Sequence, residues 1–352
     1  SPYASKAPMF QSYARKPASR TLLGTLLGTL LGTLSKTLAQ RFAQVAAVGL
    51  LLSSCQASSN NLSTTNPSAE PLGPTRTIEH AIGTSQVPIA PARVVVLDTA
   101  PLDAAIALGI TPVGSIAYGT LPTYLGNNVE SISIVGDGNQ PNLEAILQLK
   151  PDLILGSKPG TEKIYAQLSQ IAPTVLSTDS GRKGDWPEHF RLYAEALGKS
   201  EQAEQLIQNY QAQAEQLKQQ FSQAETLEIS VLSPFDGQPW TYTAGSFPGA
   251  VLQDIGLSRN PAQAGTRRYA IKLSQEALNK LDGDYIFLVY SSYFPGSLKK
   301  EAFVSDPIWS QLNAVQQENV CEVPNETWIA GRSILAASQI LTDIEQCIAP
   351  AD

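Results

Sequence analysis

The sequence predicts an α/β protein built as two similar lobes joined by a long helix. Three observations predict this fold class. Short apolar strands alternate with helical segments in two blocks, an amphipathic helix separates the blocks, and one helix–strand unit recurs in both. Such alternation is typical of parallel strands covered by helices.

The first block, predicted over residues 75–186, opens on a run of β-branched residues at 93–98 that ends at Asp98. A helix over 101–109 follows it and ends at Gly109. The later strands of this block are predicted at 111–117, 131–137, 152–157 and 174–178, with helices at 141–150 and 161–170. The order strand, helix, strand therefore continues through the block.

The pattern changes over residues 187–223, where apolar residues fall three or four apart among Gln, Glu and Lys. This spacing predicts one long amphipathic helix, about 35 Å long even over 200–222 alone. The second α/β block follows over residues 224–352. Its strands are predicted at 227–235, 240–245, 284–292 and 319–324, and its helices at 248–256 and 333–347.

One unit recurs in the two blocks. Glu144 is followed by Leu, Asp and Ile after five, eight and ten residues, and Glu276 is followed by the same three residues at the same spacings. This match favours two related lobes. Chance similarity between two βα units is the alternative.

The N-terminal segment, residues 1–54, carries six basic and no acidic residues and ends in a short apolar stretch that stops at Cys55. An apolar core of about 11 residues is too short to span a bilayer, and the basic front is typical of a secretory signal. Leu52-Ser-Ser-Cys55 resembles a bacterial lipobox, which predicts a lipid anchor on Cys55. The other interpretation is a buried helix that ends on a chance cysteine. Residues 55–74 are polar and predict a flexible linker.

The chain after Cys55 holds all 31 acidic and 18 of the 24 basic residues, so its net charge is about −13. Such a charge argues against nucleic acid as a partner. Cys321 and Cys347 are the other cysteines, and an exported protein meets oxidising conditions. A disulfide between them is therefore expected, with two buried free thiols as the alternative.

Several stretches resemble the iron–siderophore substrate-binding lipoproteins of ABC importers. They are TIEHAIGT at 77–84, PARVVVL at 91–97, PNLEAILQLKPDLI at 141–154, IAPTV at 171–175, DPIW at 306–309 and the segment 328–344. The resemblance covers about residues 75–348. It implies two Rossmann-like lobes, a rigid connecting helix and a ligand cleft between the lobes. It also implies a monomer at the periplasm or cell surface that delivers an iron(III)–siderophore complex to an ABC permease dimer with ATPase subunits.

An enzymatic function finds no support in the motifs. The two histidines, His80 and His189, form no zinc-ligand pattern, and no GxSxG, P-loop or GxGxxG motif occurs. We therefore expect neither catalysis nor a cofactor. Within the same class of importer, cobalamin or haem remains an alternative ligand.

A ferric chelate is already fully ligated, so its receptor needs cations and flat aromatic rings rather than metal ligands. The second block supplies such groups at or after strand ends and at the start of the last helix. The predicted ligand-binding residues there are Trp240, Tyr242, Arg267, Arg268, Tyr290, Tyr293, Trp328 and Arg332.

The first block offers loops after its strands at Asp98-Thr99, Tyr118, residues 137–140 and Lys158. Of these, Tyr118 and Lys158 are predicted ligand-binding residues. Many relatives place an arginine after the strand that corresponds to 152–157. Here that arginine is absent and Lys158 is the cation in its place, which leaves the type of chelate open.

Glu144 and Glu276 are predicted to dock on the permease. The resemblance implies this role, since in such importers the glutamate of each repeated unit meets arginines on one permease subunit. Charge complementarity of this kind sets register more than affinity.

Overall fold

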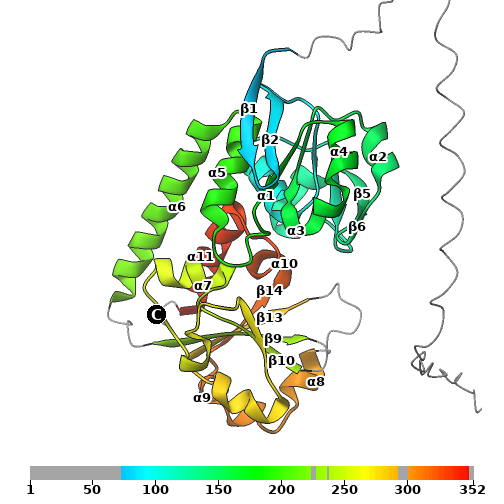
Figure 1. Cartoon of the computed structure of the whole chain (residues 1–352). Coiled ribbons are helices and arrows are strands. Elements are labelled where there is room, and N and C mark those ends of the chain that lie inside the picture. The colour runs from blue at the N-terminus through cyan, green and yellow to red at the C-terminus, as the bar shows by residue number, and fades with distance from the viewer. Residues whose placement is uncertain (1–72, 223–226, 236–237, 292–299, 349–352) are drawn as a thin grey trace, which may run out of the picture. The chain divides into compact units, whose positions relative to one another are not determined.

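The computed structural model describes residues 73–222, 227–235, 238–291 and 300–348, which belong to one compact unit, residues 67–352. The other unit, Ser1–Asn66, lies outside the described residues, as does Cys55. Figure 1 shows helices and strands mixed throughout the described chain. The predicted α/β class and the two lobes joined by helix are confirmed.

The N-terminal lobe begins with a β1–β2 hairpin and continues as an α/β sheet. Its elements are β1 (Thr75–His80), β2 (Gly83–Pro88), β3 (Val94–Val96), α1 (Thr99–Ala107), β4 (Gly114–Ala117), η1 (Thr123–Val129), β5 (Ser133–Asp137), β6 (Gln140–Pro141), α2 (Leu143–Gln148), β7 (Leu153–Ser157), α3 (Lys158–Thr161), η2 (Glu162–Ile164), α4 (Tyr165–Ile171) and β8 (Thr174–Ser177).

The strand order β6-β5-β4-β3-β7-β8 is parallel except for the short β6. The chain leaves β3 toward β4 and β5 and then returns to β7 on the other side of β3. The order therefore reverses between β3 and β7, and such a reversal opens a crevice at the carboxyl ends of the strands.

The connection between the lobes is two helices rather than the one predicted over 187–223. α5 (Trp186–Leu197) ends at Gly198, whose φ of 71° is the left-handed conformation that glycine adopts without strain. α6 (Ser200–Gln220) then runs for 21 residues, about 31 Å, along one side of the unit (Figure 1).

The C-terminal lobe has a mixed sheet of order β12-β10-β9-β13-β14, with β11 also paired to β9. The expected parallel strands are present as β9, β13 and β14, whereas β10 and β12 are antiparallel to their neighbours. Its elements are β9 (Glu228–Phe235), β10 (Gln238–Tyr242), α7 (Phe247–Asp254), β11 (Ser258–Arg259), η4 (Pro261–Gln263), β12 (Ala270–Lys272), η5 (Gln275–Leu281), β13 (Tyr285–Tyr290), α8 (Lys300–Val304), η6 (Trp309–Gln311), α9 (Asn313–Gln316), β14 (Val320–Pro324), α10 (Asn325–Trp328) and α11 (Ile334–Ile348).

Helix α11 binds the two lobes together. It contacts α6, α1, α5 and α7, and its buried face belongs to one apolar core that includes residues of both sheets. Two smaller cores cover the outer faces of the sheets, one under α2 and α4 and one under η5 and η6. The interface between the lobes is therefore packed like a protein interior.

The recurring unit of the sequence has the same structural role in both lobes. Asp152 accepts the backbone N–H of Arg93, just before β3, at 2.8 Å. Asp284 accepts the backbone N–H of Glu228, at the start of β9, at 2.7 Å. Each aspartate thus ties the repeated helix–strand unit to the strand that comes first along the chain in its six-stranded sheet, β3 or β9, which favours related lobes over chance similarity.

Among the helices of the described residues, none combines the length and the apolar character that crossing a bilayer requires.

Candidate functional site

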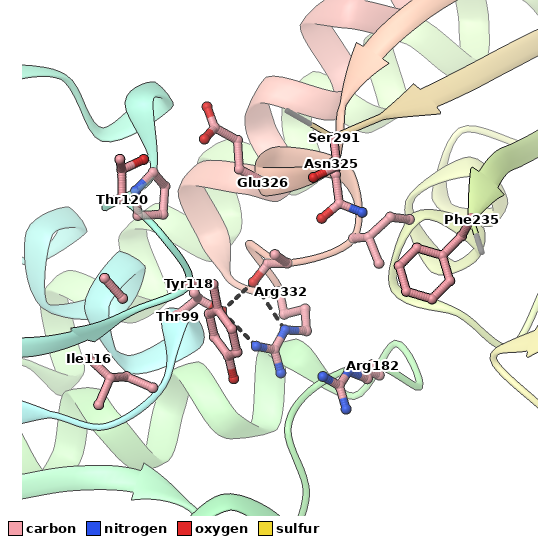
Figure 2. A pocket seen from close by; sticks show the side chains of 14 residues that line it. Thr99, Ile116, Tyr118, Thr120, Arg182, Phe235, Ser291, Asn325, Glu326 and Arg332 are labelled. Atoms are coloured by element: carbon pink, nitrogen blue, oxygen red, sulfur yellow. Dashed lines mark hydrogen bonds between the residues drawn. The ribbon is translucent and has the colours of Figure 1, made fainter. Parts of the chain in front are cut away.

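A pocket of about 200 Å³ lies where the carboxyl ends of β3 and β4 face the C-terminal lobe. Both lobes contribute to its wall (Figure 2). The lining residues are Thr99, Ile116, Ala117, Tyr118, Thr120, Pro122, Arg182, Phe235, Ser291, Asn325, Glu326, Ile329, Ala330 and Arg332.

An ion pair between Asp98 and the lining residue Arg332 lies beside this pocket, at the point where the strand order reverses. Asp98 follows β3, and its Oδ2 accepts a hydrogen bond from Ser157 Oγ, at the end of β7, at 2.7 Å. Its Oδ1 lies 2.6 Å from Nη2 of Arg332, which comes from the segment between α10 and α11. Both side chains are buried, with 7% and 2% exposure. The crevice of the first lobe is thus closed by an arginine from the far end of the chain.

The charges of this pair stabilise each other. Burial alone would raise the pKa of Asp98, but the Arg332 guanidinium and the hydrogen bonds from Ser157 and Thr99 hold the pKa below its usual range. Burial alone would lower the pKa of Arg332, and Asp98 outweighs it, so that pKa is raised. Both groups are therefore ionised at neutral pH.

Arg332 has further partners that fix its position. Its Nη2 donates to Thr99 Oγ1 at 2.6 Å, its Nε donates to the Ala330 carbonyl at 3.0 Å, and its Nη1 donates to the Ser180 carbonyl. Its backbone has a φ of 57°, an uncommon conformation for a residue with a side chain. Arg332 is thus a fixed part of the pocket lining whose charge is already balanced by Asp98.

A second buried carboxylate joins the lobes beside the pocket. Asp103 of α1 accepts the backbone N–H groups of Leu335 and Ala336 at 3.0 and 2.9 Å, at the start of α11, and the hydroxyl of Tyr124 at 2.8 Å. Burial raises the pKa of Asp103 to about 6, although these hydrogen bonds oppose the shift. The carboxylate supplies acceptors that the first turn of α11 otherwise lacks.

Arg182 is a cation of the pocket that forms no ion pair with any residue that the structure describes. It lies in the β8–α5 loop, residues 178–185, is exposed, and makes no side-chain hydrogen bond or salt bridge with another described residue. In Figure 2 the side chain of Arg182 lies on the same side of the pocket as Arg332. Arg182 was not among the ligand-binding residues predicted from the sequence. Its position after the strand β8 was the available signal, because the loops after parallel strands form the crevice.

Aromatic rings line the pocket from both lobes. Tyr118 follows β4, and burial raises the pKa of its hydroxyl. A Cβ added to Gly138 would lie 1.8 Å from Cε1 of Tyr118, so the absence of a side chain there makes room for the ring. Phe235 ends β9, is 39% exposed, and packs edge-on against Trp240 with centroids 5.9 Å apart.

Of the predicted ligand-binding residues, Tyr118 and Arg332 line this pocket. Trp240 does not line the pocket, but its ring packs against Phe235, which does. Lys158 forms a salt bridge with Glu162, with Nζ 3.6 Å from Oε1, and does not line the pocket. Tyr293 lies outside the described residues.

Trp328, predicted to bind the ligand, is instead buried in the core. Its side chain is fully buried, stacks on Phe287 with centroids 4.6 Å apart, and donates Nε1–H to Asp343 at 2.8 Å. It is a core residue and offers no stacking surface to a ligand in this structure.

Four other predicted residues also lie outside the lining. Tyr242 is 8% exposed, and burial raises its pKa to about 12. Arg267 and Arg268 are exposed in the segment before β12, and Tyr290 is 40% exposed at the end of β13. The structure does not bring these residues into this pocket.

The remaining predicted residues lie away from the pocket. Glu144 is exposed on α2 and Glu276 is exposed on η5. Cys321 of β14 and Cys347 of α11 form a disulfide, with Cα atoms 6.1 Å apart.

Known proteins that are similar to this chain are binding proteins. A family model described as periplasmic binding protein matches residues 94–327. The chain is 33% identical to a probable siderophore-binding lipoprotein, YfiY, of Bacillus subtilis, over 84% of this chain and 93% of the relative. It is 32% identical to an achromobactin-binding periplasmic protein of Dickeya dadantii, over 72% and 85%.

A solved structure is similar over most of the described chain. The crystal structure of Staphylococcus aureus SirA complexed with staphyloferrin B matches with a TM-score of 0.69 and 30% sequence identity, over 78% of this chain and 98% of that one.

Proposed function

We propose, from the premise that the chain belongs to the periplasmic binding protein family, that it captures a ferric siderophore outside the cytoplasm and delivers it to an ABC importer. The family and the relatives above are substrate-binding proteins, so binding and release without catalysis is part of this proposal.

One observation carries the proposal. The pocket between the lobes presents the Arg182 guanidinium, which has no ion-pair partner among the described residues, together with Tyr118 and Phe235. A guanidinium that is not neutralised by the protein attracts an anionic or electron-rich rim, and aromatic faces pack against its flat parts. Nothing in this wall needs to ligate iron, because a siderophore supplies the ligands itself.

A thermal-shift titration tests the proposal. Ferric citrate-type, hydroxamate and catecholate chelates, cobalamin and haem are compared at equal concentration, because a ligand that binds only the folded state raises the melting temperature. We expect the largest rise with an anionic ferric chelate. A rise only with cobalamin or haem supports that alternative, and no rise with any of them overturns the proposal.

Arg182→Ala is expected to weaken binding of the stabilising chelate by about 1–3 kcal/mol, because it removes a charge-assisted contact. Fluorescence titration of the pure protein measures the change. Arg267→Ala is the matched control, since it removes an exposed arginine that does not line the pocket. A loss in Arg267→Ala with none in Arg182→Ala would move the ligand site to the segment before β12.

Gly138→Ala is expected to weaken the same binding through Tyr118, because the new methyl group would occupy the space of the tyrosine ring. The loss in affinity should be about 5-fold to 150-fold, since forcing a side chain aside in a packed site costs about 1–3 kcal/mol. Gly265→Ala is the control, because a Cβ there meets nothing within 4 Å. Unchanged affinity in Gly138→Ala would show that the position of Tyr118 does not matter to the ligand.

The partner in this proposal is an ABC permease dimer with its ATPase subunits, met by a monomer of this protein. Glu144 and Glu276 begin the repeated units, are both exposed, and precede the two aspartates that have equivalent hydrogen bonds. A pair of acids at equivalent places suits a pair of basic sites on a symmetric dimer.

The double variant Glu144→Arg, Glu276→Arg is expected to keep the chelate affinity and the melting temperature but to abolish iron uptake by cells. Radioactive iron uptake measures the effect, and Glu162→Arg and Glu301→Arg, also exposed acids, are the matched controls. Normal uptake by the double variant would contradict docking through these residues.

We further propose that a lipid on Cys55 holds the protein at the membrane. Two acyl chains on one cysteine give a stable anchor, where one chain gives a marginal one. Some relatives are named lipoproteins, which supports this assignment. Labelling of cells with a radioactive fatty acid, with Cys55→Ser as control, tests it.

A further inference from the structure

The β8–α5 loop that carries Arg182 also gathers metal-binding side chains. Asp179 and Asp185 lie in this loop, and His189 follows in the first turn of α5. One possible ligand atom from each of the three lies within 4.8 Å of the others. None of these three residues lines the pocket described above.

Two buried atoms of this cluster have no hydrogen-bond partner among the described residues. His189 is 5% exposed, and its Nε2 lies 3.3 Å from Thr178 Oγ1 and 3.6 Å from Asp185 Oδ2. Its Nδ1, and Oδ1 of Asp185, make no hydrogen bond within the described part of the chain. Buried polar atoms without partners are costly, so a bound water molecule or ion that pairs with them would stabilise the loop.

The chemistry of the cluster selects a cation. Two carboxylates and one imidazole are a mixed oxygen and nitrogen set, which suits Zn²⁺ or Mn²⁺, whereas Mg²⁺ and Ca²⁺ prefer oxygen alone. Asp185 and His189 also line a surface pocket of about 420 Å³, together with the acids Glu79 and Glu188 and with no lysine or arginine. A cation therefore has an entry path whose charge attracts it.

We propose that Asp179, Asp185 and His189 bind one divalent first-row transition-metal ion that braces the β8–α5 loop. Ligand atoms around a tetrahedral Zn²⁺ are about 3.4 Å apart, so binding would draw the three side chains closer than they lie now. Water completes the coordination.

The position of the loop gives such an ion a consequence for the ligand pocket. The Ser180 carbonyl accepts a hydrogen bond from Arg332, and the Arg182 carbonyl accepts one from the N–H of Phe247, in the C-terminal lobe, at 3.0 Å. The ion would thus fix a loop that touches both lobes and holds the Arg182 guanidinium of the pocket. The site itself stands independently of the proposed ligand.

Metal binding is tested first on the full chain without a histidine tag. Zn²⁺ is the probe, because a site with these ligands binds it more tightly than Mn²⁺. Titration calorimetry and metal content after dialysis should give one Zn²⁺ per chain, and Asp185→Asn should weaken binding at least about tenfold. Glu188→Gln, which removes an acid from the same surface pocket but not from the cluster, should bind as the native chain does.

The rate of trypsin cleavage then measures how firmly the β8–α5 loop is held, because Arg182 and Lys183 are both exposed cleavage sites. Zn²⁺ should slow cleavage at these two bonds in the native chain and in Glu188→Gln, and leave it unchanged in Asp185→Asn. The proposal is overturned if no Zn²⁺ is retained, if Asp185→Asn and Asp179→Asn bind Zn²⁺ as tightly as the native chain, or if bound Zn²⁺ gives no protection. None of these outcomes depends on a siderophore, so the proposed function is tested separately.

Discussion

Replacing Asp98 with alanine is expected to lower the free energy of unfolding by about 3–5 kcal/mol, because it leaves the buried guanidinium of Arg332 without its counter-ion. Urea denaturation at neutral pH measures the loss. The pKa of Asp98 is held below its usual range in the folded protein. The stabilisation is therefore complete above the pKa of an unfolded aspartate and is lost as the pH falls through the lowered folded value.

Two variants control this experiment. Glu204→Ala breaks the exposed pair of Arg191 and Glu204, whose atoms are 2.7 Å apart, and should leave the midpoint of unfolding unchanged. Adding Arg332→Met to Asp98→Ala should recover part of the loss, since no unpaired charge then stays buried. A double variant no more stable than Asp98→Ala would show that lost packing, rather than the isolated charge, causes the effect.

Removal of the disulfide is expected to have the next largest effect. Cys321 and Cys347 are 26 residues apart, and cross-linking a loop of that length restricts the unfolded chain by about 3–4 kcal/mol. The variant Cys321→Ser, Cys347→Ser should therefore unfold at a lower urea concentration than the oxidised protein. The bond also ties β14 to α11, the helix that joins the lobes.

Reduction supplies the control for the disulfide. The native chain treated with dithiothreitol should unfold like the double serine variant, and the reductant should not change the variant itself. Equal stability of the oxidised protein and the variant would mean that the bond strains the native state by as much as it restricts the unfolded one.

Much of the fold could be predicted from the sequence because its signals are local. The apolar run that ends at Asp98 and the Gly109 stop signal mark β3 and α1 without any tertiary information. The repeated spacing after Glu144 and Glu276 indicated two related lobes, and Asp152 and Asp284 now explain it by equivalent hydrogen bonds. The break at Gly198 was a local signal too, but the amphipathic pattern on both sides of it concealed the turn.

The site was only partly predictable, because it depends on contacts between distant residues. The rule that loops after parallel strands form the crevice led to Asp98, Thr99 and Tyr118. It does not say which aromatic residues the core takes up, so Trp328 was wrongly assigned to the ligand. It also cannot show that Arg332 is neutralised while Arg182 has no ion-pair partner among the described residues, since that depends on a partner 234 residues away.

That separation has a consequence for how the protein is made. Synthesis proceeds from the N-terminus, so the first lobe emerges long before Arg332 and the start of α11. Until then, Asp98 has hydrogen bonds from Thr99 and Ser157 but no counter-ion, and Asp103 has the Tyr124 hydroxyl but not the N–H groups of α11. The partly made chain is therefore poorly suited to fold early. The pocket forms only when nearly the whole chain is available.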